Sequence, residues 1–180
     1  MSRILVIDDN PDNLITAQAL LKLLIKDFEV ITADSGQSGI EKAKAQLPDT
    51  ILMDIHMPGM DGFEACRQIK TIFETRHIPV IMLTAVRTDS ASRVKALNIG
   101  ADAFLTKPID ESELAAQVKA MLRIKKAEDH LRHEKDLLEE MVEQRVNDLR
   151  IANDQLLMEM AEREKAEGEA RLKSAAIENS

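Results

Sequence analysis

The chain has 180 residues, of which 44% are hydrophobic, and this content predicts one substantial core with an extension. Its net charge of −8 and isoelectric point near 5.1 argue against the concentrated basic patch that binds nucleic acid or an anionic membrane. The single cysteine, Cys66, has no partner for an internal disulfide, and no apolar run is long enough to span a bilayer. We therefore expect a cytoplasmic protein that binds neither nucleic acid nor membrane.

Short apolar runs bounded by turn residues predict five strands. They cover residues 3–7, 28–33, 50–54, 78–83 and 102–105. Helical periodicity fills the stretches between them. The first predicted helix begins at Pro11 or Asp12, and Asp34 with Ser35 caps the second.

The third and fourth predicted helices complete the alternation of strands and helices. The third is lined by four residues at helical spacing, Phe63, Cys66, Ile69 and Phe73. The fourth covers residues 88–98, and Gly100 stands just past its end. Five strands that alternate with single helices predict an α/β fold, a doubly wound five-stranded parallel sheet with helices on both faces.

The last predicted helix is too long for a compact domain. Asp110 and Glu113 form a capping box, and neither proline nor glycine interrupts the chain after them until Gly168. About sixty helical residues would measure about 90 Å, so such a helix needs a partner along its length. A heptad frame predicts a parallel dimeric coiled coil. One row of its core positions holds Met121, Val142, Leu149 and Leu156, and the other holds Ile124, Leu131, Leu138 and Ala152.

The heptad frame is imperfect. Its core also holds Glu128, Lys135, Arg145 and Glu159, whereas Met141, Val146 and Met160 lie just beside it. Core charges weaken a coiled coil and keep it from a single fixed packing. We expect a coil that can change between two states.

Polar groups follow four of the predicted strands. These groups are Asp8 with Asp9, Asp54, Thr84 and Lys107. A turn rich in proline and glycine follows Asp54, which is predicted to face solvent at its strand end. Since ligands of open parallel sheets bind at the carboxyl ends of the strands, these residues are predicted to converge on one site.

The chemistry of this set indicates phosphoryl transfer. Carboxylates that are roughly 4 Å apart repel by about 4 kcal/mol per pair at an effective dielectric near 20, so the cluster needs a cation. Mg²⁺ prefers oxygen ligands and bridges carboxylates to phosphate. With Mg²⁺ and Lys107 neutralising a phosphoryl group, Asp54 could attack phosphorus, and the Thr84 hydroxyl could donate to a phosphoryl oxygen.

Residues 1–124 resemble the receiver domain of two-component response regulators. The resemblance is carried by Asp8-Asp9, by residues 53–62 (MDIHMPGMDG), by Thr84-Ala85 and by Lys107-Pro108. It implies that Asp54 is the phosphoacceptor, that a histidine kinase or phosphotransfer protein supplies the phosphoryl group, and that the Lys107-Pro108 bond is cis. It also implies that Asp9, Asp54 and the backbone carbonyl of His56 bind Mg²⁺, with Asp8 acting through water.

The same resemblance implies a switch between Thr84 and Phe104, an aromatic residue on the last strand. Phe104 has no hydroxyl, so packing alone would distinguish its inward and outward states. Positions His56 and Val86 tune the access of water to the phosphoaspartate in this family. Val86 is apolar and cannot orient water, so we expect slow self-dephosphorylation.

The C-terminal part is similar to the signalling helices that join receiver or sensory domains to output modules. We expect a coiled-coil signalling helix over residues 125–170, a homodimer through it, and a ragged end or the start of an output domain at 171–180. The sequence has no nucleotide-binding glycine loop, cyclase signature, paired His-Asp pattern or basic recognition helix. The chain is therefore expected to be a piece of a longer protein and to lack an enzymatic output.

Two other functions stay open at this stage. A haloacid-dehalogenase type of phosphohydrolase also uses Asp and Mg²⁺, but its signature is Asp-x-Asp and this chain has the adjacent acids Asp8 and Asp9. An inert receiver-fold adaptor with a coiled coil is the other alternative. A phosphorelay role for His130 or His133 is less favoured, because neither has the sequence context of a kinase phosphoacceptor helix.

Overall fold

The computed structural model describes residues 2–85 and 98–178. The chain divides into two compact units, Met1–Asp129 and His130–Ser180, and the expected domain boundary after residue 124 lies inside the first. Val86 and, apart from Asn98, the helix predicted over residues 88–98 lie outside the described residues. In the part of the chain that is described, no helix combines the length and the apolar character needed to cross a bilayer.

The first unit contains a five-stranded parallel sheet in the order β2-β1-β3-β4-β5, which confirms the predicted fold class. The strands are β1 (Ser2–Ile7), β2 (Phe28–Ala33), β3 (Thr50–Asp54), β4 (Val80–Ala85) and β5 (Ala103–Lys107). The predicted ends of the last two strands were wrong. Pairing of Thr84 with Thr106 and of Ala85 with Lys107 extends both strands beyond their apolar runs.

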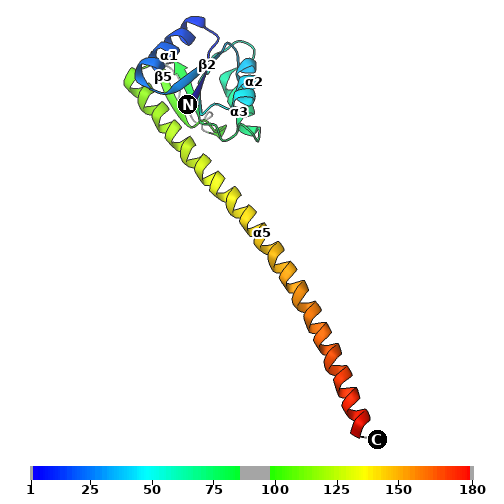
Figure 1. Cartoon of the computed structure of the whole chain (residues 1–180). Helices are drawn as coiled ribbons and strands as arrows, with labels where there is room; N and C mark the ends of the chain where they lie inside the picture. Colours follow the sequence, from blue (N-terminus) through cyan, green and yellow to red (C-terminus); the bar gives the residue numbers. More distant parts are fainter. Residues whose placement is uncertain (1, 86–97, 179–180) are drawn as a thin grey trace. The chain divides into compact units, whose positions relative to one another are not determined.

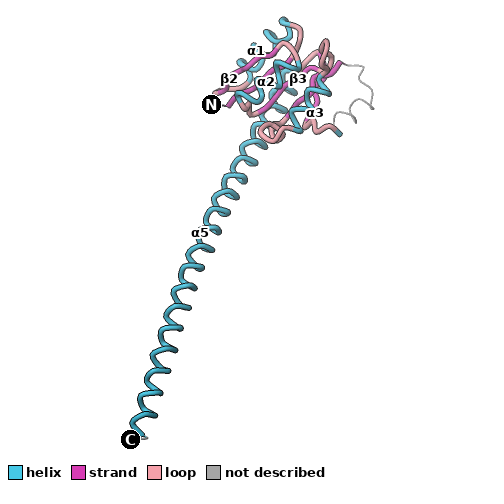
Figure 2. The backbone as a smooth tube through the Cα atoms, turned by 90° about the vertical axis from the view of Figure 1, so that its right-hand side faces the viewer, coloured by secondary structure: helices cyan, strands magenta, loops and turns pink. Residues whose placement is uncertain are grey.

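Helices cover both faces of this sheet (Figures 1 and 2). The described helices are α1 (Pro11–Leu24), α2 (Gly36–Gln46), α3 (Gly62–Thr71) and α5 (Glu111–Glu178). Buried residues of α2 and α3 pack on one face of the sheet, and those of α1 and the first turns of α5 pack on the other. Successive residues of each strand therefore face different helices, as the alternation of side chains along a strand requires.

Two helix starts have a predicted capping residue, Ser35 or Asp110, whereas Asn10, which caps α1, was not predicted as a cap. The side chain of Asn10 accepts a hydrogen bond from the Asp12 N–H, and Pro11 occupies the first turn of α1. Ser35 caps α2, and Asp110 accepts from the Glu113 N–H at the start of α5. These side chains satisfy backbone donors that have no partner inside the helix.

Two predicted core positions were wrong. Phe73 lies beyond the end of α3, where the residue is 72% exposed and the centre of its ring lies 4.7 Å from the Arg76 guanidinium carbon. Met121 is buried with Leu114 and Val118 in the core of the first unit, so it is not available to a coiled coil. Cys66 is fully buried, as predicted, and burial raises the pKa of its thiol to about 11.

The described part of the second unit is the part of α5 that follows Asp129. Every side chain described there, from His130 to residue 168, is exposed to solvent. Large apolar side chains are among them, and Leu149 is 68% exposed. A helix of this kind has no core of its own.

Candidate functional site

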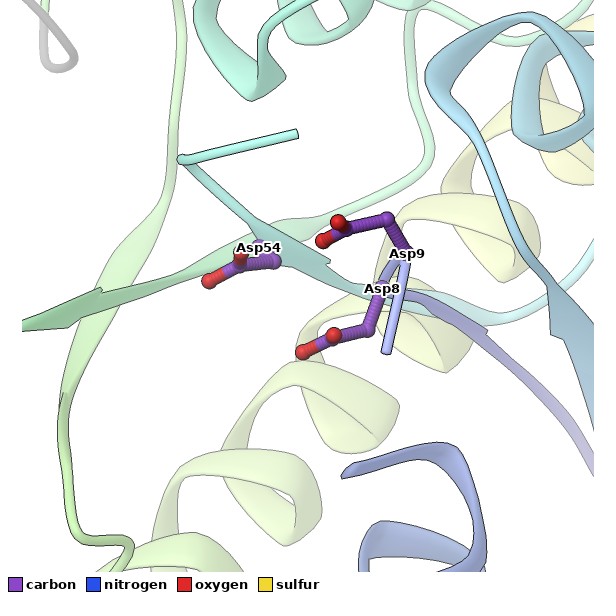
Figure 3. A group of neighbouring side chains, drawn as sticks. All are labelled: Asp8, Asp9 and Asp54. Carbon is purple, nitrogen blue, oxygen red and sulfur yellow. The ribbon is translucent and has the colours of Figure 1, made fainter. Parts of the chain in front are cut away.

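Three acidic side chains meet at the carboxyl ends of two neighbouring strands. Asp8 and Asp9 follow β1, Asp54 ends β3, and each can offer a carboxylate oxygen such that the three atoms lie within 4.8 Å of one another. Figure 3 shows their carboxylates projecting to the same side. The sheet therefore brings together the acids that the sequence predicted to converge.

Asp54 is buried, and the prediction that it faces solvent was wrong. Only 6% of the residue is exposed. It is the last residue of a strand buried along its whole length, and its side chain alternates onto the same face as Leu52, the face covered by α1 and α5. Burial disfavours the carboxylate and raises the pKa of Asp54, although Lys107 opposes this shift.

The backbone beside Asp54 is tightly packed. A Cβ atom at Gly62 would lie 2.1 Å from the carbonyl oxygen of Asp54. The Gly62 N–H donates to the carbonyl oxygen of Ile55 at 2.9 Å. Only glycine fits here, so the turn rich in glycine and proline holds the end of β3 in place.

Lys107 connects two of the three acids. Its Nζ atom lies 2.7 Å from Asp8 Oδ2 and 2.7 Å from Asp54 Oδ1. Burial disfavours the ammonium, but the hydrogen bonds to Asp54 and Asp8 outweigh it and raise the pKa of Lys107. The Lys107-Pro108 peptide bond is cis, as the resemblance implied.

Asp8 accepts hydrogen bonds from three directions. Besides Lys107, it accepts from the Asn10 N–H at 2.9 Å and from the side-chain amide of Asn13, which lies 2.9 Å from Oδ1 and 3.1 Å from Oδ2. Asn13 was not among the predicted site residues. Its position five residues after Asp8, in the first turn of the helix that follows the strand, is the signal that could have found it.

The two predicted switch residues lie on one face of the sheet. Thr84 is fully buried and follows Leu83, the register partner of Asp54. Phe104 packs against the core on the side of α2 and α3. Alternation along β4 and β5 directs Thr84 and Phe104 to that same side, two register positions apart.

The remaining predicted ligands are open to solvent. Asp9 and His56 are both exposed, beside the buried Asp8 and Asp54. Three carboxylates and one ammonium leave a formal excess of negative charge at the site. Every atom predicted to bind a metal ion here is an oxygen. This set fits a hard divalent cation that is reached from solvent.

The strand order and the cluster of strand-end acids are those of a receiver domain. The family model described as the response regulator receiver domain matches residues 4–119. The chain therefore belongs to the response regulator receiver family.

Relatives of known name and structure agree with this assignment. The response regulator PleD of Caulobacter vibrioides is 45% identical over 131 residues, which cover 73% of this chain and 28% of PleD. Protein PilH of Pseudomonas aeruginosa is 38% identical over 122 residues, which cover 68% of this chain and 98% of PilH. A receiver domain structure from Clostridium thermocellum superposes with a TM-score of 0.64 at 31% identity, over 71% of this chain and 98% of that one.

Proposed function

We propose that this chain is the receiver of a two-component phosphorelay and that Asp54 accepts the phosphoryl group of a histidine kinase or a phosphotransfer protein. The contact between Lys107 and Asp54, 2.7 Å long and beside two further acids, carries the proposal. The Asp54 oxygen forms a bond to phosphorus while the bond from phosphorus to the donor histidine nitrogen breaks, and the imidazole keeps the electron pair. Lys107 neutralises charge on the transferred group.

Mg²⁺ is the cation that we propose for the acidic cluster. Asp9, Asp54 and the backbone carbonyl of His56 would hold it, with Asp8 acting through water. The bound ion supplies positive charge that neutralises phosphoryl oxygens. Asp8 keeps its hydrogen bonds to Lys107 and Asn13, so it orients Lys107 from the buried side of the site.

Thr84 and Phe104 form the proposed switch. The Thr84 hydroxyl, at the carboxyl end of the strand beside β3, would donate to a phosphoryl oxygen on Asp54, and Phe104 would repack on the α2 and α3 face that it shares with Thr84. Their shared face and neighbouring strands support this coupling. Packing of the Phe104 ring is the property that changes, because the ring has no hydroxyl.

The helical second unit is the proposed output connector. We propose that it pairs with a second copy as a parallel coiled coil and passes the change to an output module. Its exposed apolar side chains support a pairing role. The chemistry of the chain itself would be limited to phosphoryl acceptance and slow self-dephosphorylation.

Phosphorylation by acetyl phosphate with Mg²⁺, followed by intact mass, tests the proposal. We expect one added phosphoryl group, none in Asp54→Asn, and normal labelling in Asp34→Asn, which changes a strand-end acid outside the cluster. No labelling of the unmodified chain would indicate an inert adaptor. Continuous turnover of p-nitrophenyl phosphate would indicate a phosphohydrolase instead.

Light scattering, with and without the phosphoryl mimic beryllofluoride, tests the homodimer separately. A dimer in both states would place the signal in a change of packing within the coil. A monomer that dimerises only with the mimic, and only with Asp54 intact, would mean that phosphorylation completes the coil.

A further inference from the structure

The exposed apolar side chains of the second unit follow a repeat that differs from the heptad frame. Seven large apolar residues, all 57–68% exposed, form one row: Leu131, Leu138, Val142, Val146, Leu149, Leu156 and Met160. Lys135 and Asn153 fill the two gaps in the row. The steps between successive positions are then four, three, four, four, three, four, three and four residues.

This row stays on one side of the helix. An α-helix turns about 100° per residue, so the nine positions fall within an arc of about 80°. The first six steps form two consecutive 11-residue repeats, which follow a straight helix more closely than a heptad does. The five other large apolar side chains of this stretch form no continuous row, because ten residues separate the second from the third: Leu137, Met141, Ile151, Leu157 and Met158.

Because the row advances four residues from Val142 to Val146, it differs after Val142 from the heptad frame in the side chains that occupy the core. A heptad frame through Val142 places Arg145 and Glu159 in the core. The row described above replaces them with Val146 and Met160. Two charged core positions on each helix are thereby exchanged for apolar ones, and Ala152 is exchanged for Asn153.

We propose that these nine positions, the 131–160 seam, are the surface on which α5 pairs in parallel and in register with α5 of a second copy of this chain. The proposal rests on the parallel homodimer of the proposed function, and it adds the residues and the register of the pairing. The partner is thus a second identical helix.

Asn153 argues for this partner and this direction. In a parallel, in-register pair each seam residue faces its own copy, and two facing amides can each donate and accept one hydrogen bond. Antiparallel pairing over the same seam would place Asn153 opposite Leu138 and Lys135 opposite Leu156. The amide would then be buried without a hydrogen-bond partner, which is unfavourable.

Lys135 is the one charged residue among the nine seam positions. Its Nζ atom lies 3.3 Å from Glu139 Oε1 on the same helix, so its charge has a partner that moves with it. Its methylene stem can cover apolar surface while the ammonium stays in water. The seam therefore tolerates Lys135 facing its own copy.

Disulfide cross-linking of single-cysteine substitutions in the full chain tests the seam with matched neighbours. Val146→Cys is compared with Arg145→Cys, and Met160→Cys with Glu159→Cys, by non-reducing electrophoresis after diamide, with and without beryllofluoride. Cys66 is buried and does not interfere. Because a disulfide needs closely facing Cβ atoms, we expect the seam variants to form dimers at least about tenfold faster than their neighbours.

Each other outcome overturns the seam, and light scattering of the unmodified chain separates the two proposals. Faster cross-linking at Arg145→Cys and Glu159→Cys would restore the heptad frame and leave the homodimer intact. Cross-linking at Val146→Cys without Met160→Cys would indicate antiparallel pairing, since residue 146 lies near the middle of the seam and residue 160 at its end. A dimeric mass without cross-links would indicate that the interface lies outside the seam. A monomeric mass in both states would refute the homodimer itself.

Discussion

Apolar side chains form a buried core in the first unit of this chain and are exposed to solvent in the second. In the first unit every described strand is covered by helices, and Ile4, Leu52 and Ile81 are at most 1% exposed. In the second unit Leu149 and Met158 are 68% and 69% exposed. Burial of apolar surface is the main stabilising term in folding, so the first unit can be stable as a single copy. The second can gain such burial only from another surface.

This difference separates chemistry from association. The acidic cluster and Lys107 lie wholly in the first unit, so phosphoryl acceptance should not depend on protein concentration. The seam lies wholly in the second unit, and its pairing is a mass-action equilibrium. In the unphosphorylated chain, substitutions in one unit should therefore leave the other unchanged.

Leu149→Asp should have the largest effect, and only on association. In the proposed seam it buries two facing carboxylates without partners, which costs about 3–5 kcal/mol, or more than about 100-fold in the dimer Kd. Sedimentation over a concentration series measures this change. Labelling by acetyl phosphate should match that of the unmodified chain, and slower labelling would contradict the separation of the two units.

Lys107→Ala should have the next largest effect, and only on chemistry. Loss of one positioned charge at a phosphoryl site lowers the rate of transfer by about 100-fold or more. The rate is measured by labelling with acetyl phosphate and quenching the reaction at a series of times. Lys42→Ala is the matched control, because Lys42 donates to the Thr32 carbonyl, outside the cluster. Equal rates in the two variants would remove Lys107 from the mechanism.

Gly62→Ala should destabilise the first unit by about 1–3 kcal/mol, as overpacking of a filled site does. The added methyl group would lie 2.1 Å from the Asp54 carbonyl oxygen, so the end of β3 must shift. Urea denaturation measures the loss. Gly59→Ala is a useful comparison, because a Cβ atom at Gly59 meets no atom within 4 Å and its only penalty is a positive φ of 76°. A milder effect at Gly62 than at Gly59 would contradict the packing argument.

Local sequence signals predicted most of the fold. They failed where strand pairing or helix termination determines where an element ends. Ser35 and Asp110 could be identified as caps, because a cap depends on a few adjacent residues. Phe73 has the spacing of a core residue, but α3 ends first and the Ile72 N–H closes on the Gln68 carbonyl. The spacing of apolar residues alone does not indicate where a helix ends.

The sequence predicted which residues meet at the site, but not how buried they are or which other side chains contact them. The strand ends predicted that Asp8, Asp9 and Asp54 would meet. The burial of Asp54 followed from alternation along β3 and from the helices that cover that face, which are long-range features. The amide of Asn13 was missed because its contact with Asp8 depends on how α1 leaves β1.

Asn13→Ala should weaken Mg²⁺ binding by about tenfold, as loss of a group that orients a ligand commonly does. Asn13 donates to both carboxylate oxygens of Asp8, and its removal frees that side chain to turn. Isothermal titration with Mg²⁺ measures the affinity. Thr16→Ala is the matched control on the same helix, since the Thr16 hydroxyl donates to the Asp12 carbonyl. Unchanged affinity in Asn13→Ala would contradict this orienting role.

Asp54→Asn should have the smallest effect on the fold, and its sign depends on pH. Burial raises the pKa of Asp54 above its ordinary value of 3.8, so the folded chain takes up a proton at a higher pH than the unfolded chain. Above the raised pKa the ionised carboxylate opposes folding, and Asp54→Asn should be the more stable form in EDTA at neutral pH. As pH falls from the raised pKa toward 3.8, the unmodified chain should gain stability relative to the variant. Urea denaturation of both forms across this window measures the difference, and Mg²⁺ should reverse the neutral-pH order by binding the ionised site. A difference that does not change with pH would mean that the burial of Asp54 has no electrostatic consequence.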